Sequence, residues 1–92
     1  MTARVIRSRR AAAEIEDITA SLEELSLVAM RRFLESLERA QQLLSEHPDL
    51  GTPGHRPGIR RLVVGNYILS YRRREGVEIF AVRDAHRRDA RF

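Results

Sequence analysis

The chain has 92 residues, 42% hydrophobic and 33% charged, which excludes a disordered chain and fits one small globular domain over residues 1–92. Its formal net charge is +4, and all 17 basic residues are arginine, whose guanidinium fork favours an anionic partner. Cysteine is absent, which rules out disulfides and thiolate metal sites, and no stretch approaches the roughly 20 apolar residues of a membrane span.

The first half of the chain predicts a strand and a helix. Arg4–Ser8 is typical of a short strand, and the Ser8 side chain can cap the helix that follows. Ser21 and Glu24 have the spacing of a capping box, which would break that helix. We expect a continuous helix over Arg9–Leu25 instead, because apolar residues recur at helical spacing throughout it: Ala11, Ile15, Ile18, Leu22 and Leu25.

A second helix is predicted over Leu27–Glu46, with Ser26 as its N-cap and Pro48 blocking its continuation. Two helices joined by almost no loop must fold back on each other as a hairpin. The apolar stripe of the second helix consists of Met30, Phe33, Leu34, Leu37, Ala40 and Leu44.

The second half predicts a connector and a sheet. Asp49–Gly58, with three glycines and two prolines, is irregular, and a two-residue period begins at Ile59. Gly65-Asn66 fits a type II′ hairpin turn and Glu75-Gly76 a second turn, and Asp84–Phe92 is a charged tail. The strands are Ile59–Val64, Tyr67–Arg72 and Val77–Arg83.

The predicted fold class is therefore α+β. An N-terminal strand leads into an antiparallel helix hairpin, which packs on an antiparallel sheet with a three-stranded C-terminal meander. Residues 51–92 hold ten arginines and four acidic residues, a net +6, whereas residues 1–50 have a net −2. Nucleic acid or an acidic protein fits that basic half, although a solvated basic face is the simpler alternative. The binding candidates are Arg60, Arg61, Arg72, Arg74, Arg83, Arg87 and Arg88.

Several short motifs occur in the same order as in a known family. They are Pro48-x-x-Gly51, Arg60-Arg61, Gly65-Asn66-Tyr67, Tyr71, and His86 followed by Arg88 and Asp89. With the order of the elements, they resemble the ParE branch of the RelE/ParE superfamily, the small bacterial toxins of type II toxin–antitoxin modules. The resemblance covers nearly the whole chain and implies the RelE/ParE-like fold.

The resemblance leaves two targets open. ParE-like toxins inhibit DNA gyrase by binding, whereas RelE-like toxins cleave mRNA on the ribosome without a metal. If this chain were a nuclease, the resemblance would assign His86, Arg61, Arg88 and Tyr71 to catalysis. RelE-like nucleases usually carry an arginine three residues before the tyrosine matching Tyr71, but Ile68 stands there, and the chain has no lysine. Because many ParE-like chains also have that arginine, Ile68 does not decide the target.

We therefore expect a gyrase inhibitor with no catalytic residue, and keep the RNA nuclease and a non-toxic binding module as alternatives. Tyr67 and Tyr71 share one strand face with Leu69, so at least one tyrosine is expected in the core. The resemblance further implies a cytoplasmic protein without metal, cofactor or membrane contact. Its expected partners are DNA gyrase and an acidic or ribbon-helix-helix antitoxin of the ParD kind, which would wrap the helix hairpin and the basic sheet edge, with higher-order oligomers possible.

Overall fold

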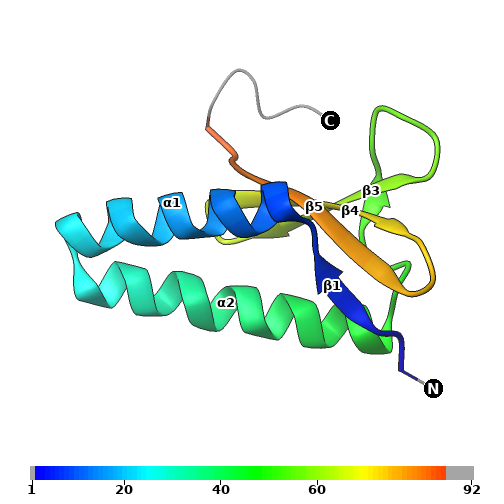
Figure 1. Ribbon diagram of the computed structural model, residues 1–92, viewed down its shortest axis with the longest axis horizontal. Helices are drawn as coiled ribbons and strands as arrows, with labels where there is room; N and C mark the ends of the chain where they lie inside the picture. The colour runs from blue at the N-terminus through cyan, green and yellow to red at the C-terminus, as the bar shows by residue number, and fades with distance from the viewer. Residues whose placement is uncertain (1, 87–92) are drawn as a thin grey trace.

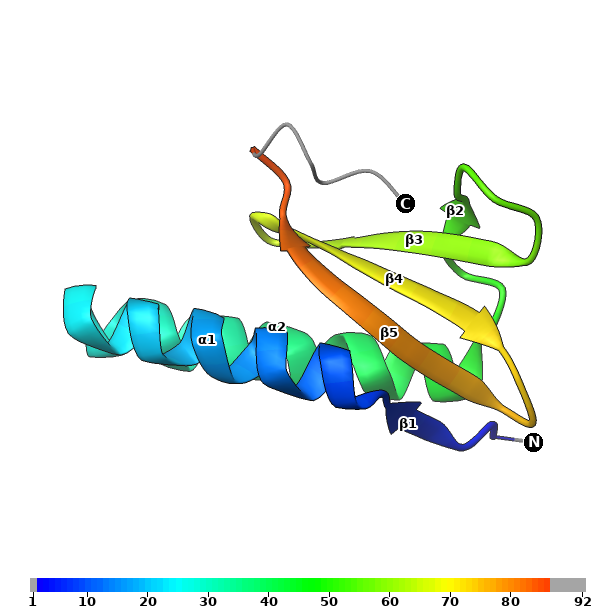
Figure 2. The ribbon, with the colours of Figure 1, turned by 45° about the horizontal axis from the view of Figure 1, so that its top comes forward.

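The computed structural model describes residues 2–86, in which two helices lie on one side of a five-stranded sheet (Figures 1 and 2). The α+β architecture and the helix hairpin predicted from the sequence are confirmed. The elements are β1 (Val5–Arg7), α1 (Arg9–Leu25), α2 (Leu27–Glu46), β2 (Thr52–Pro53), β3 (Ile59–Val64), β4 (Tyr67–Arg73) and β5 (Val77–Asp84).

The sheet has the strand order β1-β5-β4-β3-β2. The meander of β3, β4 and β5 is antiparallel, as predicted. The sheet as a whole is mixed, however, because β1 pairs with β5 in parallel, with Val5 opposite Val77. The connector adds the short edge strand β2, in which Thr52 pairs with Arg61. A two-residue strand of this kind leaves no periodicity to detect in a sequence rich in glycine and proline.

Two serines set both ends of α1 and the start of α2. The Ser8 hydroxyl accepts a hydrogen bond of 3.0 Å from the Ala11 amide at the start of α1. Ser26 closes α1 with its own amide, which donates to the Leu22 carbonyl, and opens α2 with its hydroxyl, which accepts from Ala29. One residue thus serves both helices, which is why they reverse without a loop. Within residues 2–86, neither helix is long and apolar enough to cross a membrane.

The core lies between the helix hairpin and the near face of the sheet. Leu25 and Leu34, which were expected in it, are instead 82% and 39% exposed. The joined end of the two helices projects past the end of the sheet (Figure 2), so the apolar stripes continue beyond the surface that buries them. The buried cluster comprises Ala11, Ile15, Phe33, Leu37, Ala40, Leu44, Val64, Leu69, Tyr71, Val77, Ile79 and Val82.

Candidate functional site

Three of the predicted arginines share the outer face of the sheet, the face turned away from the helices. Leu69 and Tyr71 of β4 belong to the core, so the side chains that alternate with them point outward. Arg72 is one of these, and Arg61 of β3 lies opposite the outward residue Ser70. Arg83 of β5 lies opposite the outward residue Ile68.

A β-bulge at Phe80 decides where Arg83 points. The register of β4 against β5 shifts between Ser70 and Tyr71, because Ser70 pairs with Ala81 whereas Tyr71 pairs with Ile79. Phe80 is therefore an extra residue, and the alternation of β5 changes phase after it. Val82 enters the core as a result, and Arg83 joins the outer face.

Two of the three outer arginines have acidic partners. Arg72 Nη2 lies 2.7 Å from Glu78 Oε1, and its guanidinium lies 5.7 Å from the centre of the Phe80 ring. Arg83 Nε lies 3.1 Å from Oε2 of Glu14, which reaches it from α1. Each of these two guanidinium groups therefore has a carboxylate beside it that offsets part of its positive charge.

Arg61 and Ser70 differ from these neighbours because each has a polar atom without a partner. Ser70 is fully buried, and its hydroxyl has no hydrogen-bond partner in the described part of the chain. The same holds for the buried Nε atom of Arg61, and no ion pair is found for that arginine within residues 2–86. The two residues face each other across β3 and β4, so their Cβ atoms lie about 5 Å apart.

Arg60, although adjacent to Arg61, is held on the other side of the sheet. Its Nη1 donates hydrogen bonds to the carbonyl of Gly51 at 2.7 Å and to that of Asp49 at 3.4 Å. Its Nε lies 3.7 Å from the Asp49 carboxylate, and Arg73 Nη1 lies 3.5 Å from the same oxygen. These contacts hold the connector against the sheet, which is a structural role.

Tyr71 is buried and hydrogen-bonded on the helix side of the sheet. It is fully buried, and its hydroxyl accepts a hydrogen bond of 2.9 Å from the Gly51 amide. Tyr71 and Arg61 therefore lie on opposite faces, and the structure does not bring them together as a nuclease site would require. Tyr67 also packs against the core, with its ring 4.8 Å from that of Phe33.

The remaining predicted residues lie at the ends of β5 and in its turn. His86 is exposed just after β5, and its amide donates to the Asp84 carboxylate at 2.9 Å. Arg74 is exposed in the turn before β5, whereas Arg87 and Arg88 lie outside the described residues. Among residues 2–86, no three His, Asp or Glu side chains are grouped so that they could hold a metal ion.

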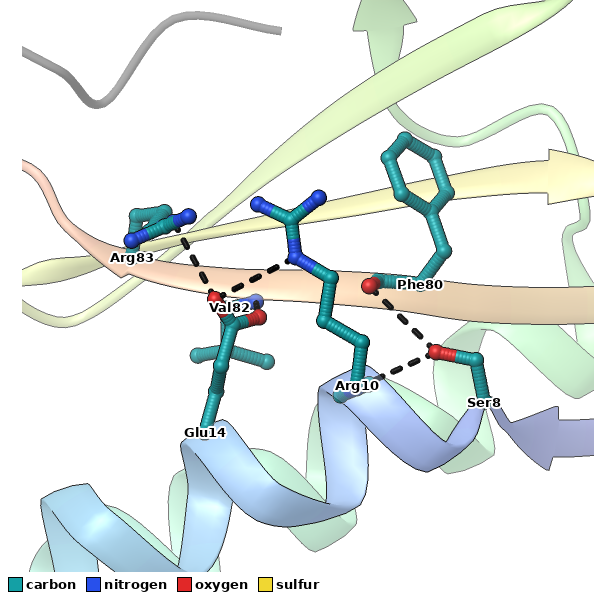
Figure 3. A network of polar contacts seen from close by, with 7 residues as sticks. Ser8, Arg10, Glu14, Phe80, Val82 and Arg83 are labelled. Carbon is teal, nitrogen blue, oxygen red and sulfur yellow. Dashed lines mark hydrogen bonds and ion pairs between the residues drawn. The ribbon is translucent and has the colours of Figure 1, made fainter.

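The Glu14 side chain bonds to the edge of β5 beyond the point where β1 ends. Ser8 still bonds to β5, since its amide donates to the Ile79 carbonyl and its hydroxyl to that of Phe80. Beyond that point the Val82 amide donates to Glu14 Oε1 at 3.0 Å. Figure 3 shows the Glu14 carboxylate between Arg10, 3.5 Å away, and Arg83. The carboxylate thus takes the place of a neighbouring strand at Val82 and joins α1 to Arg83.

A groove of about 370 Å³ separates the second half of α1 from the end of the sheet. Its lining combines apolar side chains with three carboxylates and one arginine. Leu25, which lines the groove, and Leu27 and Val28, which follow it in the chain, are exposed at the projecting end of the helix hairpin. The groove is lined by Glu14, Asp17, Ile18, Ser21, Leu22, Leu25, Tyr67, Val82, Arg83 and Asp84.

Sequence reasoning missed Ser70 and Glu14. Ser70 is the one polar residue between Tyr67 and Tyr71, which was a signal that its side chain needs a partner. Glu14 is one of several acidic residues on the first helix, and nothing in the sequence distinguishes it from the others. Its contact with β5 depends on where β1 ends.

The matches to known proteins span nearly the whole chain. Residues 5–89 match the family model described as the ParE toxin of the type II toxin–antitoxin system parDE. "Putative toxin Y4kP" of Sinorhizobium fredii (strain NBRC 101917 / NGR234) is 34% identical over 79 residues, which are 84% of this chain and 82% of that protein.

A solved structure titled "Chromosomal ParDE TA system from P. aeruginosa" has the same fold. It superposes with a TM-score of 0.71 at 20% sequence identity, over 92% of this chain and 98% of the other.

Proposed function

Because the chain belongs to the ParE toxin family of type II toxin–antitoxin systems, we propose that it is a toxin that inhibits DNA gyrase by binding. We further propose that a cognate antitoxin neutralises it. The observation that most strongly favours binding over RNA cleavage is the burial of the Tyr71 hydroxyl on the Gly51 amide. A hydroxyl held there cannot reach a scissile phosphate on the outer face.

Ile68 supports the same proposal. It is buried on the outer face, opposite Val63 on one side and Arg83 on the other. The resemblance places an arginine at this position in RelE-like nucleases. An aliphatic side chain cannot stabilise charge on phosphorus, so the outer face lacks one of the groups that metal-free cleavage would need.

The antitoxin is the second part of the proposal. The groove beside α1 includes Leu25, and Leu25, Leu27 and Val28 are exposed apolar residues at the joined end of the helix hairpin. Exposed apolar residues grouped in this way mark contact surfaces. An antitoxin segment that folds on binding would bury them, and its acidic residues would suit the arginine-rich C-terminal half.

The test is a supercoiling reaction with purified toxin, gyrase, relaxed plasmid and ATP. The expected result is loss of supercoiling or accumulation of cleaved DNA, reversed by adding the antitoxin first. Heat-unfolded toxin is the control. Unchanged supercoiling at high micromolar folded toxin would contradict the gyrase target.

A parallel reaction on translating ribosomes tests the alternative activity. The proposal expects intact mRNA, detected by primer extension, under conditions in which the toxin is folded. Cleaved mRNA would replace the gyrase proposal with the nuclease. If neither reaction responds and induction leaves growth unimpaired, the chain is a non-toxic binding module.

A further inference from the structure

We propose that Arg61 and Ser70 form an oxyanion site on the outer face of the sheet, and that it binds a phosphate of the DNA backbone. The oxyanion site is inferred from the burial of one polar atom in each residue and from the lack of a hydrogen-bond partner for either atom. Its assignment to DNA rests on the proposed function, in which the target enzyme works on DNA.

The site is defined by two donors that lack an acceptor. The Nε atom of Arg61 can only donate a hydrogen bond, and the Ser70 hydroxyl needs an acceptor for its proton. Both atoms are buried and without a partner in residues 2–86, and the two residues face each other across β3 and β4. Unpaired buried polar groups are uncommon in folded proteins because each carries a desolvation penalty. One negatively charged oxygen between them would satisfy both.

The charges around the pair favour an anion at Arg61 in particular. Arg72 is paired with Glu78, and Arg83 with Glu14. Arg61 lies opposite Ser70 on the neighbouring strand, and no ion pair with a carboxylate is found for it in the described part of the chain. An incoming anion therefore meets one uncompensated guanidinium there.

A phosphate diester fits these donors better than an isolated carboxylate. Arginine and serine are among the side chains that most often bond to DNA phosphates, and the guanidinium fork matches a phosphate with two parallel bonds. The outer face is a strand surface without a helix over it in residues 2–86 (Figure 2), so an extended polyanion can lie along it.

Fluorescence anisotropy with a short fluorescein-labelled DNA duplex tests the proposal without gyrase. Arg61→Gln should weaken binding about tenfold, as expected for loss of a hydrogen bond between charged groups. The matched control is Arg39→Gln, which removes the same charge from an exposed residue of α2 that bonds only to Ser36 among described side chains. It should weaken binding by no more than about twofold, because exposed charge distant from the site acts only through screened attraction.

Ser70→Ala is the sharper variant because it changes no charge. Removing one neutral donor should weaken DNA binding about three- to tenfold. The same substitution should raise the urea midpoint of the free protein, since it removes a buried hydroxyl that has no partner. A role in packing alone predicts no change in DNA affinity.

Three results would overturn the proposal. Equal losses in the Arg61 and Arg39 variants would mean that DNA binding is a general effect of net charge. Unchanged DNA affinity in Ser70→Ala would exclude an oxyanion site that includes Ser70. Tighter, Arg61-dependent binding of a polyglutamate peptide or a single-stranded RNA would assign the site to a different partner. Because gyrase is absent, these results are separable from failure of the supercoiling test.

Discussion

The Tyr71 hydroxyl accepts a 2.9 Å hydrogen bond from the Gly51 amide, although 20 residues separate the two in the chain. Both residues are buried, and the bond fastens the connector after α2 to the middle of β4. It explains two motifs at once, the glycine three residues after Pro48 and the tyrosine in the central strand. Both serve the packing of the connector against the sheet.

Tyr71→Phe should lower the free energy of unfolding by about 1–3 kcal/mol, because it leaves the buried Gly51 amide without an acceptor. Urea denaturation followed by circular dichroism measures this. Any loss of toxicity should parallel the loss of folded protein. A variant as stable as the parent but without toxicity would point to a direct role of the hydroxyl in target contact.

Gly51→Ala should be at least as damaging as the tyrosine variant. A Cβ atom there would lie 2.6 Å from the Arg61 carbonyl oxygen and 2.9 Å from the Tyr71 ring, so backbone must move. Overpacking of this kind destabilises by about 1–3 kcal/mol, sometimes more. Thermal unfolding measures it, with Thr52→Ala as the exposed neighbouring control, expected to stay within about 0.5 kcal/mol. Equal melting temperatures for the two variants would contradict the described packing.

Glu14→Ala should destabilise the chain by about 1–3 kcal/mol, since the Val82 amide loses its acceptor and Arg83 loses its ion pair. Glu14→Gln keeps an acceptor oxygen and should lose less than the alanine variant. Glu16→Gln is the matched control, because Glu16 is exposed on the same helix. Hydrogen exchange should show faster exchange at Val82 in the alanine variant only. Unchanged exchange there would contradict the edge role of Glu14.

Leu25→Gln should leave stability within about 0.5 kcal/mol, because this side chain is 82% exposed. It should weaken antitoxin binding at least about tenfold if the antitoxin covers the end of the helix hairpin, since one buried leucine contributes roughly 1.5–3 kcal/mol. Isothermal titration calorimetry measures the affinity. Leu43→Gln, at a 45% exposed site near the other end of α2, is the control. Equal affinities for the two variants would exclude this docking surface.

Local sequence signals predicted the order of the elements and most of their bounds. Ser8 and Ser26 mark the helix starts because capping depends only on nearby backbone groups. Gly65, with φ of +60°, opens the predicted hairpin turn for the same local reason. The family resemblance needed no tertiary information either, since it rests on short motifs in a fixed order.

Tertiary structure decided which residues meet. Strict alternation through β5 would place Arg83 on the same face as Val77 and Ile79, but the bulge at Phe80 turns it to the outer face. Leu25 continues the apolar stripe of the first helix but is exposed. The sequence does not show where along this stripe burial stops, because that depends on the length of the sheet. Long-range register, bulges and sheet size arise from contacts between distant segments, so they leave no local pattern. The pairing of Arg61 with Ser70, and hence the proposed oxyanion site, is a product of that register.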